Sequence, residues 1–170
     1  MLLRLFVMAV LCQPANAQLY KSYQKHHLWS ATLEIGGINP VLALNAEYSP
    51  FQVAGLFTTL RAGIGHTFTD YSINTFPHSV SVNILLNRKQ TKCPIPIGEP
   101  NQWFLEVGAG GLVFNRPKDK QDYRYTPMLG VRWYQTAKYT LTRYFWKSQF
   151  TPLILGRLVP WGGIGMGVIL

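Results

Sequence analysis

Cysteine is scarce in this sequence, which has only Cys12 and Cys93 among its 170 residues. Cys93 stands in a proline-rich stretch, residues 92–96, with no second cysteine and no histidine at metal-ligand spacing, so it is interpreted as a tolerated loop residue. The glycines form no G-x-G-x-x-G pattern that follows a strand and opens a helix, which is the signature of a dinucleotide site. With Cys12 in a removable leader, described below, we expect no disulfide, no metal and no cofactor.

Acidic residues and long apolar runs are also few. Seven aspartates and glutamates stand against 16 lysines and arginines, which gives a formal net charge of +9. After residue 17 no uninterrupted apolar stretch comes near the roughly 20 residues that a membrane-spanning helix needs, and no apolar stripe has helical spacing. A basic chain can bind nucleic acid, but the absence of a basic helix and the presence of an export leader disfavour nucleic acid as a partner.

The first 17 residues have the layout of a secretory signal peptide. Arg4 supplies the positive charge, Leu5–Leu11 the apolar run, and Ala15-Asn16-Ala17 a small-x-small cleavage site. A lipoprotein site at Cys12 is the alternative, but a bulky leucine precedes this cysteine where a small residue is expected. The sequence is therefore divided into a signal peptide (1–17), an N-terminal segment (18–27) and one domain (28–170).

The domain alternates apolar and polar residues with period two, which indicates β-strands whose two faces meet different environments. Most of the segments that alternate are close to the length, about 9–11 residues, that a tilted strand needs to cross a membrane. Turn-forming residues such as Ser49-Pro50 separate them. The eight predicted strands are Leu28–Gly37, Val41–Ser49, Leu56–Thr67, Thr75–Leu86, Gln102–Phe114, Tyr125–Gln135, Arg143–Ile154 and Leu158–Leu170.

In each predicted strand one face is apolar and the other is polar, charged or glycine. A soluble sandwich or lipocalin-like barrel would turn the apolar face inward, whereas an outer-membrane barrel turns it toward lipid. Glycines favour the second architecture, because glycine weakens a water-exposed strand but leaves room in a narrow lumen. The glycines on the polar face that carry this argument are Gly63, Gly65, Gly108, Gly110, Gly163, Gly165 and Gly167. The predicted fold is an all-β, antiparallel, up-and-down transmembrane β-barrel of about eight strands.

The polar face also carries three acids and three bases. Such a balance suits a confined interior, because removing one partner of a buried ion pair costs about 3–5 kcal/mol. We expect opposite-charge pairs to plug the lumen, with the glycines giving clearance to the long side chains. The predicted lumen charge network is Glu34, Glu47, Arg61, Glu106, Arg132 and Lys147.

Four stretches of the chain resemble the small outer-membrane β-barrel proteins of Gram-negative bacteria, particularly a porin-like group with short strands and a glycine-rich last hairpin. They are Leu105–Gly110, Thr126–Arg132, Phe150–Ile154 and Val159–Val168. The resemblance implies location in the outer membrane after export through the periplasm, with both termini facing the periplasm. It also implies contact with outer-membrane lipid and lipopolysaccharide.

The same resemblance gives the end of the chain a role in biogenesis. Proteins of this kind usually end in an aromatic residue that the barrel-assembly machinery reads as part of the terminal strand. This chain departs from that pattern and ends in Leu170, although alternation is kept by Ile164, Met166, Val168 and Leu170. These four residues form the predicted terminal assembly strand. We expect a monomer.

The candidate catalytic residues are His78, Ser79 and Ser81. In this alternative the chain is a lipid A deacylase or acyltransferase, because the eight-stranded barrels that it resembles include enzymes with both activities. Such chemistry needs a serine activated by a histidine. Alternation places His78 on the lipid side and both serines in the lumen, so the favoured interpretation is non-catalytic, with a structural or surface-contact role. A predicted basic loop between the fifth and sixth strands is a candidate for binding anionic lipid through Arg116, Lys118, Lys120 and Arg124.

The cleavage motif predicts that the mature chain begins at Gln18. The intact mass of protein extracted from membranes of the expressing bacterium should correspond to residues 18–170. A mass that includes residues 1–17 would show that the segment is not a cleaved leader.

Overall fold

The computed structural model describes residues 29–39, 41–53, 55–67, 73–87, 101–116, 120–136, 143–154 and 158–170. The predicted signal peptide, the N-terminal segment, Cys93 and Lys118 lie outside these ranges. No helix in the described part of the chain is long and apolar enough to cross a membrane.

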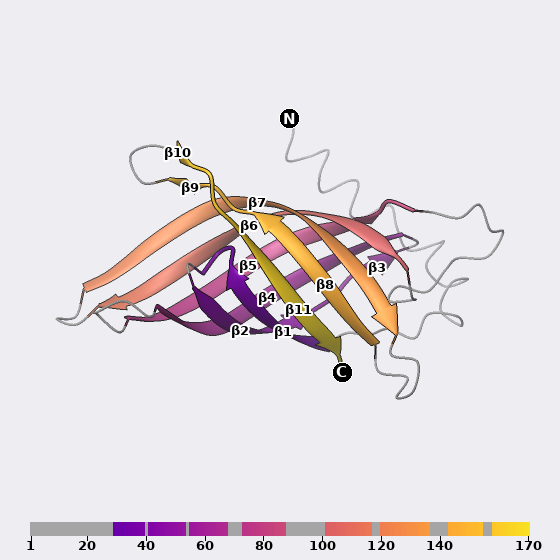
Figure 1. Ribbon diagram of the computed structural model, residues 1–170, viewed down its shortest axis with the longest axis horizontal. Coiled ribbons are helices and arrows are strands. Elements are labelled where there is room, and N and C mark those ends of the chain that lie inside the picture. Colours follow the sequence, from indigo (N-terminus) through magenta and orange to yellow (C-terminus); the bar gives the residue numbers. More distant parts are fainter. Residues whose placement is uncertain are drawn as a thin grey trace, which may run out of the picture.

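Eight antiparallel strands form a closed barrel (Figure 1), and this confirms the predicted all-β fold. Their spatial order is β2-β1-β11-β8-β7-β6-β5-β4, and the ring closes where β2 pairs with β4. A short strand, β3 (Gln52–Val53), extends the edge beside β4. The barrel strands are β1 (Trp29–Gly36), β2 (Leu42–Tyr48), β4 (Leu56–Thr67), β5 (Ile73–Leu85), β6 (Trp103–Arg116), β7 (Lys120–Thr136), β8 (Arg143–Phe150) and β11 (Gly162–Ile169).

The ring closes with a stagger that can be followed through the strand register. Starting from Ala31 and stepping across β2, β4, β5 and β6, the paired residues lead to Tyr125 on β7. Stepping the other way across β11 and β8, they lead to Gln135 on the same strand, ten residues further along. A stagger of this kind requires strands tilted by about 35–45° and leaves an interior that side chains can fill.

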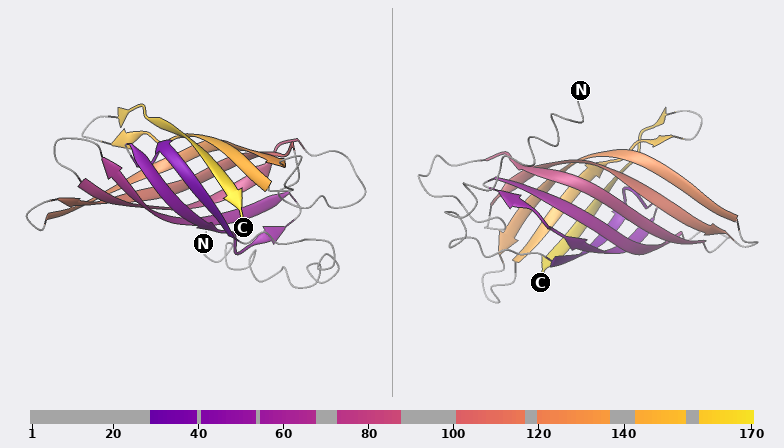
Figure 2. Two further views of the ribbon diagram at one scale, coloured as in Figure 1. Left: turned by 60° about the horizontal axis from the view of Figure 1, so that its bottom comes forward. Right: turned by 180° about the vertical axis from the view of Figure 1, so that it is seen from behind.

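The two ends of the barrel differ. At the end that we call the terminal end, the Leu170 N–H donates to the Trp29 carbonyl over 3.0 Å, so the first and last strands meet there. At the opposite, distal end the β6–β7 hairpin reaches beyond the neighbouring strands (Figures 1 and 2). The ladder of this hairpin continues to the Arg116–Lys120 pair.

The outward face is apolar. Leucine, isoleucine and valine side chains of β1, β2, β4, β5, β7 and β11 are exposed on it, among them Leu33, Leu44, Val80 and Leu129. Near the terminal end the outer aromatic rings pair, with Trp103 stacked on Trp133 at 5.1 Å between centroids. Near the distal end Phe76, Tyr123 and Tyr125 are exposed. Aromatic girdles that flank an apolar band are typical of barrels in membranes.

The interior has an aromatic layer near the terminal end, which was not predicted from the sequence. Four buried rings from β4, β6, β7 and β8 form it, with Phe57 and Phe104 edge to face at 5.0 Å and Tyr134 and Phe145 at 5.2 Å. The predicted lumen was polar, charged or glycine. The alternation nevertheless contains the signal, because each ring lies two or four residues from a predicted lumen charge on its own strand.

The distal end of the interior is filled by a turn that folds into the barrel. Ile38, in the β1–β2 connection, is 2% exposed and packs with Leu112 and Met128. Asn39 is fully buried beside it and accepts a hydrogen bond from Thr75 Oγ1 over 2.7 Å. Gly36 and Gly37 reach this geometry with φ of +73° and +78°, values that favour glycine. The sequence indicated a turn here but not its burial.

The observed strands differ most from the predicted ranges in the last two strands and at the predicted basic loop. The predicted strand Arg143–Ile154 ends as β8 at Phe150, and the predicted strand Leu158–Leu170 begins as β11 at Gly162. Between them β9 (Leu153–Ile154) and β10 (Leu158–Val159) pair as a separate small hairpin. The predicted basic loop is wrong as an element, because strand pairing continues through most of it.

The lumen glycines have a different role from the one predicted. Of the seven named from the sequence, Gly165 is the one where a long charged side chain is among the nearest neighbours of an added Cβ, which would lie 2.8 Å from Lys147 Cε. The others give room to neighbouring backbone and to uncharged side chains; a Cβ at Gly167, for instance, would collide with the Phe145 ring. The space left by these glycines therefore allows close packing of neighbouring strands more than it accommodates the ion pairs.

The aromatic layer predicts a contrast between two phenylalanines on the two faces of the barrel. Phe104→Ala removes a ring that is 0% exposed and should lower the free energy of unfolding by about 3–5 kcal/mol. Phe150→Ala removes an outward ring that is 46% exposed, and the loss should be much smaller because surrounding lipid or detergent fills the space. Urea unfolding of both variants in one detergent tests this. Equal losses would contradict the interior packing described.

Candidate functional site: the charged layer of the lumen

Six charged side chains meet in the lumen between the aromatic layer and the inward turn. They are the six predicted from alternation, and each comes from a different strand: Glu34 (β1), Glu47 (β2), Arg61 (β4), Glu106 (β6), Arg132 (β7) and Lys147 (β8). All are between 1% and 4% exposed. Because the strands are tilted and staggered, residues far apart along the chain reach one level of the lumen.

The six groups form one chain of alternating charge. Glu106 Oε1 lies 3.2 Å from Arg132 Nη2, and Arg132 Nη1 lies 2.7 Å from Glu47 Oε2. Lys147 Nζ continues the chain, 3.2 Å from Glu47 Oε1 and 2.9 Å from Glu34 Oε2.

Arg61 completes the chain at its other end, with Nη1 2.7 Å from Glu34 Oε2. Each interior charge thus has at least one partner of opposite sign.

Uncharged side chains take up further hydrogen bonds of this layer. Arg61 Nε donates to Ser79 Oγ over 2.9 Å, and Ser81 Oγ donates to Glu106 Oε1 over 2.8 Å. Gln149 Nε2 donates to Glu34 Oε1. Charge-assisted hydrogen bonds of this kind are among the stronger ones in proteins, and in a lumen with little solvent they fix the positions of the charged groups.

Arg132 joins the charged layer to the aromatic layer. Its guanidinium carbon lies 4.4 Å from the centroid of the Phe145 ring and 5.9 Å from that of Phe57. A guanidinium over an aromatic face gains a cation–π attraction that strengthens when both groups are desolvated. One face of the arginine therefore packs on rings while its nitrogens bind two carboxylates.

The cluster considered for catalysis is divided between the two faces of β5. Ser79 and Ser81 point into the lumen, where both hydroxyls are engaged by the charged layer. His78 is exposed on the outside, and its ring lies 6.3 Å from that of Tyr125. Gly111 separates the two rings in the register, and a Cβ there would meet His78. The structure does not bring the histidine and the serines together.

The other residues named from the sequence lie near the two ends of the barrel. In the candidate anionic-lipid segment, Arg116 ends β6, Lys120 begins β7 and Arg124 lies within β7, its guanidinium carbon 5.1 Å from the Phe114 ring centroid. Lys118 is outside the described residues. In the terminal strand, Ile164, Met166 and Leu170 are exposed on the outward face, and Val168 is half-buried.

The structure is a closed antiparallel barrel with an apolar exterior and a charged, filled interior. This inversion of the usual soluble arrangement is typical of small barrels that cross membranes. No protein-family model and no curated protein sequence matches the chain.

A solved structure that matches is the N-terminal β-barrel domain of Pseudomonas aeruginosa OprF. The two share 12% sequence identity with a TM-score of 0.52, over 82% of this chain and 93% of that one. At this identity the likeness shows a shared fold.

The Glu106–Arg132 ion pair predicts that a second substitution can restore stability lost in a first. Arg132→Met leaves Glu106 without its cation and should lower the free energy of unfolding by about 3–5 kcal/mol. Adding Glu106→Gln removes the stranded charge, so the double variant should recover a large part of that loss. Urea unfolding of the wild type, both single variants and the double variant forms the complete cycle. A double variant whose loss equals the sum of the single losses would show that the two groups do not interact.

Proposed function

We propose that this chain is an outer-membrane β-barrel protein of a Gram-negative bacterium with a non-catalytic structural or surface-contact role. In this proposal the chain is exported through the periplasm and its lumen is plugged. The observation that carries the proposal is the alternating chain of six buried charges, enclosed between an aromatic layer and an inward-folded turn inside an apolar exterior.

The exterior supports a lipid environment. Apolar surface in water costs about 25 cal/mol per Å², and soluble proteins seldom expose large continuous apolar patches. Here the apolar side chains of successive strands are exposed together, from Leu33 on β1 through Leu44 on β2 to Ile64 on β4. Hydrocarbon accepts such a surface without that cost, and the outer aromatic residues suit the two interfaces of a bilayer.

The interior supports a plugged lumen rather than a pore. An eight-stranded barrel is just wide enough for its own side chains to fill it. Arg132, Phe57, Phe104 and Phe145 are among the largest fully buried side chains, and Ile38 with Met128 fills the distal end. A solute would have to displace paired charges as well as packed rings.

The partners in this proposal follow from the location. Outer-membrane lipid and lipopolysaccharide surround the barrel, and the barrel-assembly machinery engages the last strand during biogenesis. With both termini in the periplasm, the β6–β7 hairpin faces outward, and the proposed contacts to lipopolysaccharide phosphates are made by Arg116, Lys118, Lys120 and Arg124. The barrel acts as a monomer and has no nucleic-acid partner.

The plugged lumen predicts that the protein inserts into bilayers without conducting. The folded protein should migrate differently on a gel before and after heating, which reports an intact barrel. In planar bilayers it should then give no sustained conductance under conditions where a larger general porin conducts. A stable open channel of nanosiemens scale from gel-shifted protein would contradict the plug.

A further inference from the structure

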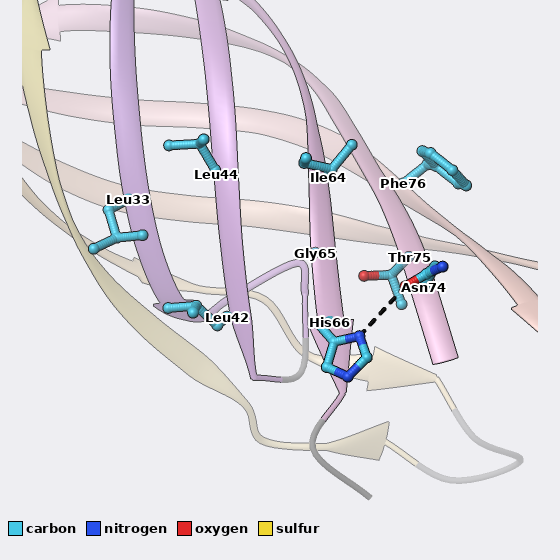
Figure 3. Close-up of a pocket in the computed structure, with 9 residues that line it drawn as sticks. All are labelled: Leu33, Leu42, Leu44, Ile64, Gly65, His66, Asn74, Thr75 and Phe76. Carbon is cyan, nitrogen blue, oxygen red and sulfur yellow. Dashed lines mark hydrogen bonds between the residues drawn. The ribbon is translucent and has the colours of Figure 1, made fainter. Parts of the chain in front are cut away.

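The outward face of the barrel has a hollow near its distal end that the charged lumen does not explain. It has a volume of about 430 Å³, which lies within the range of roughly 300–1,000 Å³ seen for small-molecule sites. β1, β2, β4 and β5 supply its walls (Figure 3): Leu33, Leu42, Leu44, Ile64, Gly65, His66, Asn74, Thr75 and Phe76. We call this hollow the outer groove.

A break in strand pairing accompanies the outer groove. The β4–β5 ladder pairs Ala62 with His78 and then Gly65 with Thr75. Between these pairs lies Pro77, which has no N–H to donate to a ladder. Ile64 and Phe76, which lie opposite each other inside this interval, are both walls of the outer groove.

Polarity changes along the outer groove. Toward the middle of the barrel its walls are Leu33, Leu44 and Ile64, all exposed and all aliphatic. At the distal rim, where β4 ends and β5 begins, His66 Nδ1 and Asn74 Oδ1 lie 3.3 Å apart. Among the residues that the structure describes, no aspartate, glutamate, lysine or arginine lines the outer groove.

We infer that the outer groove binds one acyl chain of a membrane lipid, and this inference rests on the proposed outer-membrane location. The aliphatic walls complement a hydrocarbon chain that descends from the membrane surface. In this inference the polar rim meets the ester and hydroxyl groups from which the acyl chain begins. Because most of its described lining residues are apolar, the outer groove recognises the acyl chain rather than a phosphate. Its concave shape suits one flexible chain better than the convex surface of a second barrel.

The test replaces a side chain that lines the outer groove with a larger one, which fills the groove. Ile64→Trp places a large ring between the groove walls. Ile164→Trp on β11 is the matched control, because Ile64 and Ile164 are both 61% exposed on the outward face and Ile164 does not line the outer groove. Leu44→Trp, on a neighbouring strand, is a second filling variant should Ile64→Trp fail to fold.

The measurement is native mass spectrometry of each barrel released from detergent micelles that contain a titrated amount of dimyristoylphosphatidylcholine. The wild type and Ile164→Trp should each retain one lipid with similar affinity. Ile64→Trp and Leu44→Trp should retain it about tenfold more weakly, which corresponds to about 1.4 kcal/mol. Heat-dependent gel mobility and insertion into vesicles of the same lipid are recorded for every variant.

The outcomes separate the two proposals. Equal lipid retention by the wild type and all inserted variants would overturn the acyl-chain site and leave the outer-membrane proposal standing. A wild-type chain that does not insert into vesicles would overturn both. Wild-type dimers that exclude the lipid and disappear in Ile64→Trp would assign the outer groove to a second copy of the chain and overturn the lipid.

Discussion

The narrow width of the lumen constrains the rest of this structure. Eight strands closed with a stagger of ten residues leave an interior in which every inward position competes for the same space. Glycine on the inward face therefore alternates with side chains that span the bore, such as Arg132 and Phe145. Substituting one of these glycines would push the added carbon into the backbone or side chain of a neighbouring strand, as at Gly108, where it would lie 2.2 Å from the Val80 carbonyl oxygen.

Within the lumen, the charged side chains determine which face of each strand points inward. Paired charges in a dry interior seldom stabilise a fold more than apolar residues of the same size would. They do distinguish the faces, because a strand that slipped by one residue would turn Glu47 or Lys147 into hydrocarbon and an alanine or serine inward. In a barrel whose exterior is apolar, an equally apolar interior would leave each strand with no preferred side. The ion-pair chain thus supports a unique register.

The sequence predicted the barrel, its strand count and the six interior charges because all three depend on period-two alternation. The same alternation places Phe57, Phe104, Tyr134 and Phe145 inward, although the aromatic layer that they form was not predicted. The burial of Ile38 and Asn39 could not be predicted in this way, since it depends on a turn that bends back between strands. The outer groove was equally hidden, because it needs β1, β2, β4 and β5 placed side by side.

The seam between the first and last strands stands apart from the other pairings. Every other pairing in the barrel joins two barrel strands that follow each other along the chain. The β1–β11 pairing instead joins residues near positions 30 and 169. Along this seam Thr32, Glu34 and Gly36 face Gly167, Gly165 and Gly163, so β11 inserts no side chain from these positions into the lumen. Closure here must await the synthesis of β11, and it carries the largest loop-closure entropy of any pairing in the barrel. The ring therefore has a preferred place to open, set by the order of its strands.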